Sequence, residues 1–116
     1  MTRLILMTLA MLFTCGLAHA HDLWIGSRHV TNHAGEWCCG VGDCGVVLDP
    51  QNSVDETASG YHVHGLVHLY DIVTPDFSID QTIPFKEALP SADKDFWYCR
   101  RADNSRRCFF APPGGV

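Results

Sequence analysis

The chain has 116 residues, with 13 acidic against 8 basic side chains and a formal net charge of −5. This balance argues against general nucleic-acid binding, which depends on neutralising phosphates with lysine and arginine. The length fits one domain with a modest hydrophobic core, and covalent crosslinks are a usual source of stability at that size.

Residues 1–20 have the features of a secretory signal peptide. Arg3 supplies the positive charge, residues 4–13 are an apolar run, and Ala18-His19-Ala20 offers a cleavage site. The apolar run is too short for a membrane span, which needs ~20 residues. A retained anchor and lipidation at Cys15 are the alternatives. Cleavage removes one basic and no acidic residue, so the mature domain, residues 21–116, has a formal charge of −6. We expect a periplasmic or secreted protein.

The first half of the mature chain predicts little regular structure. Residues 21–36 mix polar and apolar side chains irregularly, which predicts a loose arm or one short strand. Residues 46–48 are apolar and are stopped by Asp49-Pro50, as expected for a short buried strand. Residues 51–60 are polar and end in glycine, which predicts a loop or wide turn.

Residues 61–73 form the clearest predicted strand. Val63, Val67 and Leu69 alternate with side chains that face the other way, the period-two pattern of a strand. Further along, the sequence predicts a short strand within 77–85, one helical turn at 86–89, and two paired strands, 96–100 and 107–110, around a polar bend. The predicted class is therefore a small, mostly β domain with at most one short helix, stapled by disulfides.

The mature chain has five cysteines, an odd number. The arrangement we favour joins Cys99 to Cys108 across the last hairpin, with a second bridge from Cys44 to Cys38 or Cys39. An equally open arrangement links the front cysteines to the hairpin by two long-range bridges. The cysteine left over can form a disulfide-linked dimer. A thiolate metal site is disfavoured, because export favours bridges and the spacing from Cys39 to Cys44 is looser than in usual zinc sites.

Histidines supply a candidate metal site. His62 and His64 share one face of the predicted strand, with Cα atoms ~6.6 Å apart, close enough to hold one zinc or copper ion. His68 faces the same way but lies ~20 Å from His62 along a straight strand, too far to join them. The alternative is an exposed sheet face that carries imidazoles. Cleavage after Ala20 would make His21 the first residue, and its ring and amino group suit copper(II).

Four arginines gather at the last hairpin: Arg100, Arg101, Arg106 and Arg107. Such a patch can bind a carboxylate, a phosphate or an acidic partner. The alternative is a solvated hairpin tip that discourages pairing between sheet edges. The sequence contains no nucleophile elbow, no phosphate-binding glycine loop and no His-Glu-x-x-His, so it predicts no enzyme class.

Two stretches, residues 37–48 and 83–114, resemble a group of small exported proteins of alphaproteobacteria. The shared features are a Cys-Cys…Asp-Cys front, here Cys38 to Cys44, and a Cys…Cys-Phe-x-x-Pro-Pro back, here Cys99 to Pro113. The resemblance implies no activity and no ligand set, and the strand that carries His62 lies outside the shared pattern.

These observations favour a disulfide-stapled module that binds an unknown protein or small ligand. The second interpretation is a periplasmic copper- or zinc-binding protein that uses His62 and His64, with His21 as a further ligand. The third is a small exported enzyme without a recognisable motif.

Overall fold

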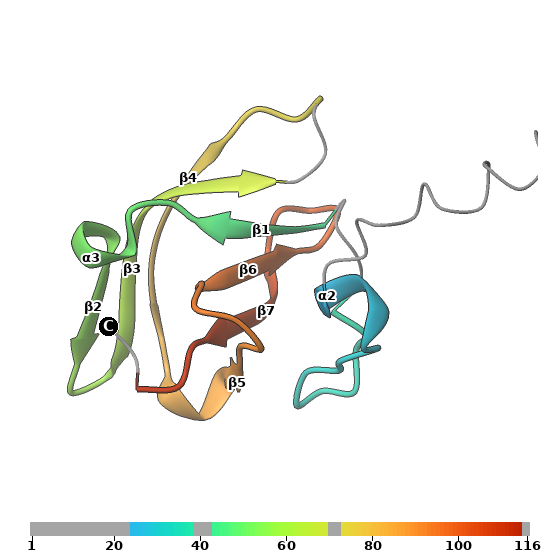
Figure 1. The fold of residues 1–116 in the computed structure, drawn as a ribbon, viewed down its shortest axis with the longest axis horizontal. Coiled ribbons are helices and arrows are strands. Elements are labelled where there is room, and N and C mark those ends of the chain that lie inside the picture. The colour runs from blue at the N-terminus through green and yellow to red at the C-terminus, as the bar shows by residue number, and fades with distance from the viewer. Residues whose placement is uncertain (1–23, 39–42, 70–72, 115–116) are drawn as a thin grey trace, which may run out of the picture.

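The computed structural model describes residues 24–38, 43–69 and 73–114. Seven strands of these residues form one sheet, accompanied by two four-residue helices and a 3₁₀ turn (Figure 1). In chain order the elements are α2 (Trp24–Ser27), β1 (Cys44–Val47), α3 (Pro50–Ser53), β2 (Val54–Thr57), β3 (Gly60–Leu69), β4 (Phe77–Ile83), η1 (Phe85–Glu87), β5 (Ala88–Pro90), β6 (Trp97–Arg100) and β7 (Arg106–Ala111). The predicted class, a small, mostly β, disulfide-stapled domain, is confirmed.

The long strand β3 organises the sheet. It pairs along one edge with β4, and along the other with β2 at its beginning and β1 at its end. The sheet continues from β1 through β6 and β7 to β5, and every pairing is antiparallel except that of β5 with β7. β1 and β3 approach closely because position 45 is glycine: a Cβ there would lie 2.5 Å from the carbonyl oxygen of His68.

The predicted alternation along β3 is confirmed. Val63, Val67 and Leu69 are buried, whereas His62, His64, Leu66 and His68 are at least partly exposed. The buried side contributes to the main core, in which valines of β1, β2 and β3 pack against Phe96, Tyr98 and Phe109. Burial of this apolar surface is the main driving force of the fold.

A second cluster covers the other face of β6 and β7. It contains Trp97, Phe110, Ile25 of α2 and four cysteines, all buried. The indole N–H groups of Trp24 and Trp97 both donate to the carboxylate of Asp93, at 2.9 Å and at 3.0 and 3.2 Å, and this ties α2 to the sheet. The prediction of a loose arm or one short strand over residues 21–36 was therefore wrong at residues 24–27, which form α2 and pack Trp24 and Ile25 into this cluster.

The loop predicted over residues 51–60 was also wrong in part. Pro50 begins a single helical turn, α3, and the chain then enters β2, which pairs with the beginning of β3. A buried Val54 anchors β2, although the next three residues are exposed. The polar composition hid this strand, because Val54 is the only one of its four residues that is buried in the core.

Both bridges of the favoured arrangement, Cys99 to Cys108 and Cys44 to Cys38 or Cys39, were wrong. The disulfides are Cys44–Cys99 and Cys38–Cys108, so the alternative with two long-range bridges is confirmed. Cys44 and Cys99 are register partners on neighbouring strands, with Cα atoms 4.0 Å apart. Cys39 lies outside the described residues.

Candidate histidine–aspartate metal site

A row of imidazoles and carboxylates crosses the exposed face of the sheet where β2, β3 and β4 lie side by side. In the strand register, His62 stands opposite Asp55 of β2, and His64 stands opposite Asp80 of β4. The alternation of β3 puts both rings on the face away from the core, and they stack with centroids 4.6 Å apart. Figure 1 shows β2 and this part of β3 at the side of the domain away from α2.

The hydrogen bonds run diagonally rather than straight across. Nε2 of His62 contacts Asp80 Oδ1 at 2.8 Å, and Nε2 of His64 contacts Asp55 Oδ2 at 2.8 Å. Each histidine thus contacts the carboxylate that faces the other histidine. The two carboxylates fix the orientation of both rings and give the site a negative charge while the imidazoles are neutral, which suits a cation.

Three of these side chains are close enough to share one metal ion. Asp55, His62 and His64 each offer a ligand atom, and the three atoms lie within 4.8 Å of one another. Imidazole nitrogen and carboxylate oxygen are ligands of zinc and of copper(II). The two imidazole side chains are 37% and 36% exposed, so an ion can reach them from solvent.

Asp80 suits a supporting role. Its carboxylate contacts Nε2 of His62, which leaves Nδ1 of that ring for an ion. Metal-binding histidines usually donate their other ring nitrogen to a carboxylate in this way, and the contact fixes the tautomer of the ligand.

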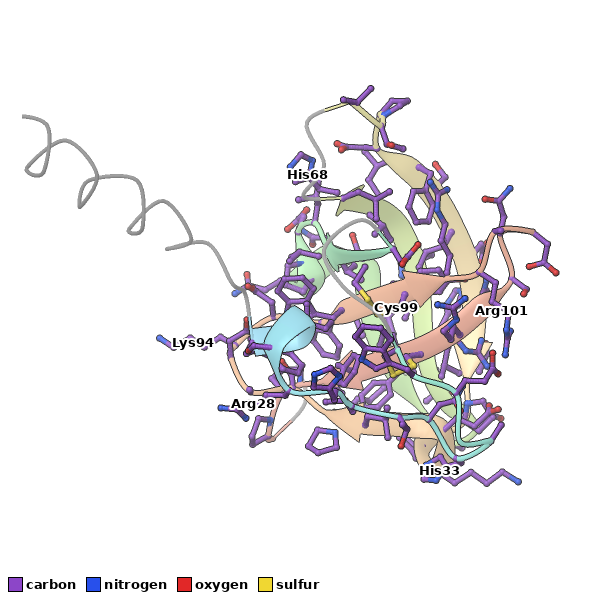
Figure 2. The ribbon with its side chains drawn as sticks, turned by 90° about the vertical axis from the view of Figure 1, so that its right-hand side faces the viewer. Arg28, His33, His68, Lys94, Cys99 and Arg101 are labelled. Atoms are coloured by element: carbon purple, nitrogen blue, oxygen red, sulfur yellow. A yellow bond between two sulfur atoms is a disulfide. The ribbon has the colours of Figure 1, made fainter. Side chains whose placement is uncertain are left out.

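His68 has a different partner. Its Nδ1 contacts Asp76 Oδ1 at 2.6 Å, and it does not belong to the three-residue group. The expectation that His68 lies too far along the strand to join His62 and His64 is therefore confirmed. Figure 2 shows His68 at the far end of the domain from His33.

Asp55 is the ligand candidate that the sequence did not reveal. It lies in the segment predicted to be a loop, and only the pairing of β2 with β3 brings it beside the histidines. The available signal was Val54 followed by three polar residues, 55–57, and then by the turn sequence Ala58-Ser59-Gly60. This pattern is compatible with an edge strand and a tight turn into β3.

The four arginines of the last hairpin all contact other side chains of the chain. The guanidinium of Arg100 lies 4.4 Å from the ring centroid of Phe77, and Arg106 donates to Gln81 Oε1 and Glu87 Oε2. They are therefore built into the fold rather than forming a fully solvated tip. Whether they also bind an external anion stays a prediction.

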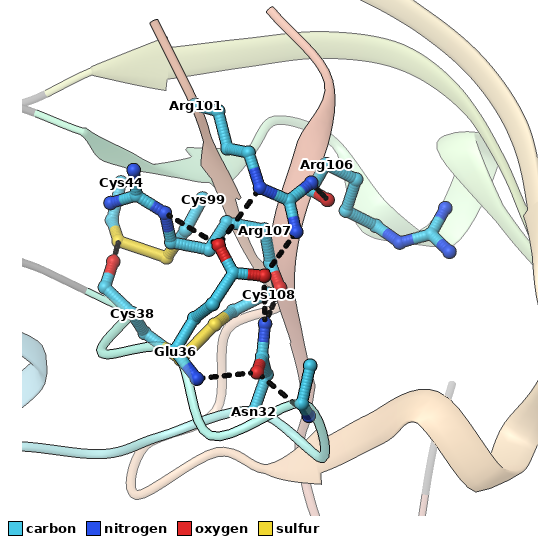
Figure 3. Close-up of a disulfide and its surroundings, with 10 residues drawn as sticks. Asn32, Glu36, Cys38, Cys44, Cys99, Arg101, Arg106, Arg107 and Cys108 are labelled. Carbon is cyan, nitrogen blue, oxygen red and sulfur yellow. Dashed lines mark hydrogen bonds and ion pairs between the residues drawn. A yellow bond between two sulfur atoms is a disulfide. The ribbon is translucent and has the colours of Figure 1, made fainter.

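Arg101 and Glu36 form the most extensive of these contacts (Figure 3). Nε of Arg101 donates to Glu36 Oε2 at 2.9 Å, and its Nη2 donates to Oε1. These bonds, with one from Asn32, lower the pKa of Glu36 from 4.5 to about 2. The hydrogen bonds to Glu36 in turn raise the pKa of Arg101. This network holds the segment before Cys38 against the hairpin, next to the Cys38–Cys108 bridge.

Several predictions lie outside the described residues: the signal peptide with its cleavage site, His21 as a copper ligand, and Cys39 as the source of a dimer. In residues 24–38, 43–69 and 73–114, no helix is long and apolar enough to cross a membrane.

Comparisons with protein-family models, with curated proteins and with solved structures found no match to this chain. The resemblance to small exported alphaproteobacterial proteins therefore stays an expectation from the sequence motifs.

Proposed function

We propose that this protein is exported to the periplasm or secreted, and that it binds one zinc or copper ion through Asp55, His62 and His64. The grouping of these three ligand atoms within 4.8 Å carries the proposal. The two disulfides support export, because such bonds persist in oxidising compartments.

The chemistry of the site supports an ion with a free coordination position. Three protein ligands leave a fourth position of a tetrahedral zinc ion for water or an external ligand. In the metal-free protein a proton lies between His64 and Asp55, and an ion would take its place. The exposure of the site suits reversible uptake and transfer of the ion better than permanent structural binding, because folding does not enclose it.

Calorimetric titration of the mature, untagged, disulfide-bonded protein with Zn²⁺ and with Cu²⁺ tests the proposal. We expect one ion per chain with a dissociation constant below roughly 1 mM, and His64→Ala should weaken binding by about tenfold or more. His68→Ala is the matched control, because His68 also lies on the exposed face of β3 and contacts an aspartate, yet stands outside the group. It should leave the affinity unchanged.

Two outcomes would contradict the proposal. One is binding no tighter than millimolar for both ions. The other is copper binding that His21→Ala abolishes while His62→Ala and His64→Ala leave it intact, which would place the ion at the amino terminus. A second pair of variants, Asp55→Asn and Asp76→Asn, should repeat the contrast, with only Asp55→Asn weakening binding.

The second candidate function is a module that binds a small ligand or a protein partner. The observation that favours it is a pocket beside the β6–β7 hairpin whose lining includes Arg101, Arg106 and Arg107.

A further inference from the structure

A pocket of about 380 Å³ lies between β4 and the end of β6 with the bend that follows it. Among the described strands β4 pairs with β3 alone, so its other edge is free to form a wall of this pocket. The volume is within the roughly 300–1,000 Å³ typical of sites for small molecules. The pocket is separate from the one beside Arg101, Arg106 and Arg107.

Alternate residues of β4 face this pocket. Phe77 and Gln81 stand opposite Val67 and Val63 of β3, both of which are buried, so they take the core side of the sheet. Ile79 lies between them and faces the same way. Phe77, Ile79 and Gln81 are only partly buried, and all three line the pocket. The strand therefore presents two apolar side chains, Phe77 and Ile79, to a molecule that enters.

The carboxylate of Asp80 belongs to the other face of β4, although Asp80 also borders the pocket. Asp80 stands opposite His64 in the register, and its Oδ1 contacts Nε2 of His62 at 2.8 Å. The pocket and the histidine–aspartate site are therefore on opposite faces of this strand. Among the described residues that line the pocket, Arg100 is the only one with a positive charge.

Arg100 is held over the apolar wall, yet the fold does not use its hydrogen-bond donors. Its guanidinium carbon lies 4.4 Å from the centroid of the Phe77 ring, a cation–π contact. Within the described parts of the chain the guanidinium makes no hydrogen bond or ion pair, unlike those of Arg101 and Arg106. Stacking occupies the face of the group and leaves the N–H groups of its edge, whose planar fork matches a carboxylate.

The inner side of the pocket is fixed by a chain of hydrogen bonds. Arg106 donates to Gln81 Oε1 at 2.8 Å, and Gln81 Nε2 donates to the hydroxyl of Tyr98 at 2.9 Å. Because an arginine can only donate, its bond sets which end of the Gln81 amide faces Tyr98. The buried Tyr98 ring also packs edge-on against Phe77, with centroids 6.0 Å apart. A ligand would thus enter a preformed site, which lowers the entropy cost of binding.

We infer that this pocket binds a small organic acid, a carboxylate carried on an apolar body. Arg100 is the principal ligand of the carboxylate, and Phe77 and Ile79 contact the body. Asn104, in the bend after β6, also lines the pocket, and its side-chain amide can donate a second hydrogen bond. An inorganic anion fits less well, because it would leave the apolar wall uncovered.

Titration of the mature disulfide-bonded protein with benzoate at low ionic strength tests the inference, with binding followed by amide NMR shifts. Two matched probes are benzamide, which keeps the ring without the charge, and acetate, which keeps the charge without the ring. We expect benzoate to bind saturably, with shifts at the amides of residues 77–81 and 98–100. Benzamide and acetate should each bind about tenfold more weakly or worse, because each lacks one of the two contacts.

Arg100→Gln should weaken benzoate binding by about tenfold or more and leave benzamide binding nearly unchanged, since it removes the charge and the fork. Arg100→Lys, which keeps the charge, should bind benzoate with intermediate affinity. Arg28→Gln is the matched control for net charge and should not change the affinity. Figure 2 shows Arg28 well away from Arg101, the neighbour of Arg100 in sequence.

Ile79→Thr gives a second test that leaves Arg100 in place. It shortens the apolar wall and keeps a β-branched side chain in the strand. Benzoate binding should weaken severalfold and acetate binding should not change, because only benzoate has a ring to contact this wall. The melting midpoint of each variant shows whether its fold is kept.

The inference would be overturned if benzoate failed to saturate below roughly 10 mM, since a dissociation constant of about 1 mM already marks weak binding. Benzamide binding as tight as that of benzoate would exclude the carboxylate contact, and equally tight acetate binding would exclude the apolar contact. Equal losses in Arg28→Gln and Arg100→Gln would mean that overall charge alone is responsible. None of these results bears on zinc or copper binding, which the β3 variants test separately.

Discussion

Cys99 and Cys108 face each other across the β6–β7 hairpin, and neither forms a disulfide with the other. Cys99 bonds to Cys44 on the strand at its other side, and Cys108 bonds to Cys38 of the segment that crosses this face. Four sulfurs therefore join β1, β6, β7 and the segment before residue 39 in one layer. A bridge within the hairpin would have left both β1 and that segment without a covalent link to the hairpin.

The two bridges are nested in sequence, which gives a prediction about stability. Cys38–Cys108 spans 70 residues and encloses Cys44–Cys99, which spans 55. When one bridge is intact, the shortest path between the two cysteines of the other runs through that bridge and is only about 15 residues long. Closing this short loop contributes about 3 kcal/mol on the chain-entropy model. Cys44→Ala with Cys99→Ala, or Cys38→Ala with Cys108→Ala, should therefore each lower the free energy of unfolding by about that amount.

Removing both bridges should cost about 7 kcal/mol, because the last one closes a long loop. That equals the whole stability of many domains of this size, so the quadruple variant should be largely unfolded. Urea unfolding followed by circular dichroism measures all three variants, and Cys39→Ala in every background prevents a new pairing. A quadruple variant that unfolds cooperatively at the original midpoint would contradict this account.

Asp93 provides the second prediction, since one carboxylate accepts hydrogen bonds from two tryptophans. Burial raises the pKa of Asp93, but hydrogen bonds from the Asp95 N–H, both indoles and Ser91 outweigh burial and hold that pKa below its usual value. Bonds to a charged acceptor contribute about 1.5–3 kcal/mol each. Asp93→Ala should therefore lower the free energy of unfolding by about 3 kcal/mol at pH 7, measured by urea unfolding with tryptophan fluorescence.

Asp95→Asn is the matched control for Asp93. The pKa of Asp95 is raised by burial and by the charge of Asp93, so at neutral pH its carboxylate is ionised in an unfavourable place. Removing that charge should leave stability unchanged or slightly higher. Equal losses in the two variants would mean that negative charge in this turn, and not the hydrogen bonds to the indoles, is what matters.

The sequence predicted the parts of the fold that depend on local patterns of residues close together in the chain. Period-two alternation placed His62 and His64 on the exposed face of β3, because the pleat of a strand fixes which side each residue takes. The last hairpin was predicted for the same reason, since two short apolar runs flank a polar bend.

The remaining features depend on which strands become neighbours, and local patterns carry little of that information. Asp55 joins the histidines only through the pairing of β2 with β3, and Cys44 reaches Cys99 only because β1 lies beside β6. The arginines looked like a free basic patch because Glu36 is 65 residues away in sequence from Arg101. The first two contacts are specified by the register of the sheet, and the third by the packing of the segment before Cys38 against the hairpin.

Glu36 gives the last prediction, a dependence of stability on pH. Its pKa is lowered from 4.5 to about 2 in the folded protein, chiefly by the hydrogen bonds from Arg101 and then by that from Asn32. A carboxylate with a lowered pKa stabilises the fold fully above its unfolded pKa, and the contribution is lost as the pH falls toward the folded value. The stabilisation by Glu36 should therefore be complete above about pH 4.5 and disappear between there and about pH 2.

Glu36→Gln removes this dependence and isolates it from the other carboxylates. The difference in urea midpoint between the wild type and Glu36→Gln should be largest at pH 6, smaller at pH 3 and close to zero at pH 2. Glu56→Gln on the exposed face of β2 serves as the control, and its difference from the wild type should stay small throughout. A difference in urea midpoint between the wild type and Glu36→Gln that stayed constant from pH 6 to pH 2 would show that the side chain contributes by packing and not by its charge.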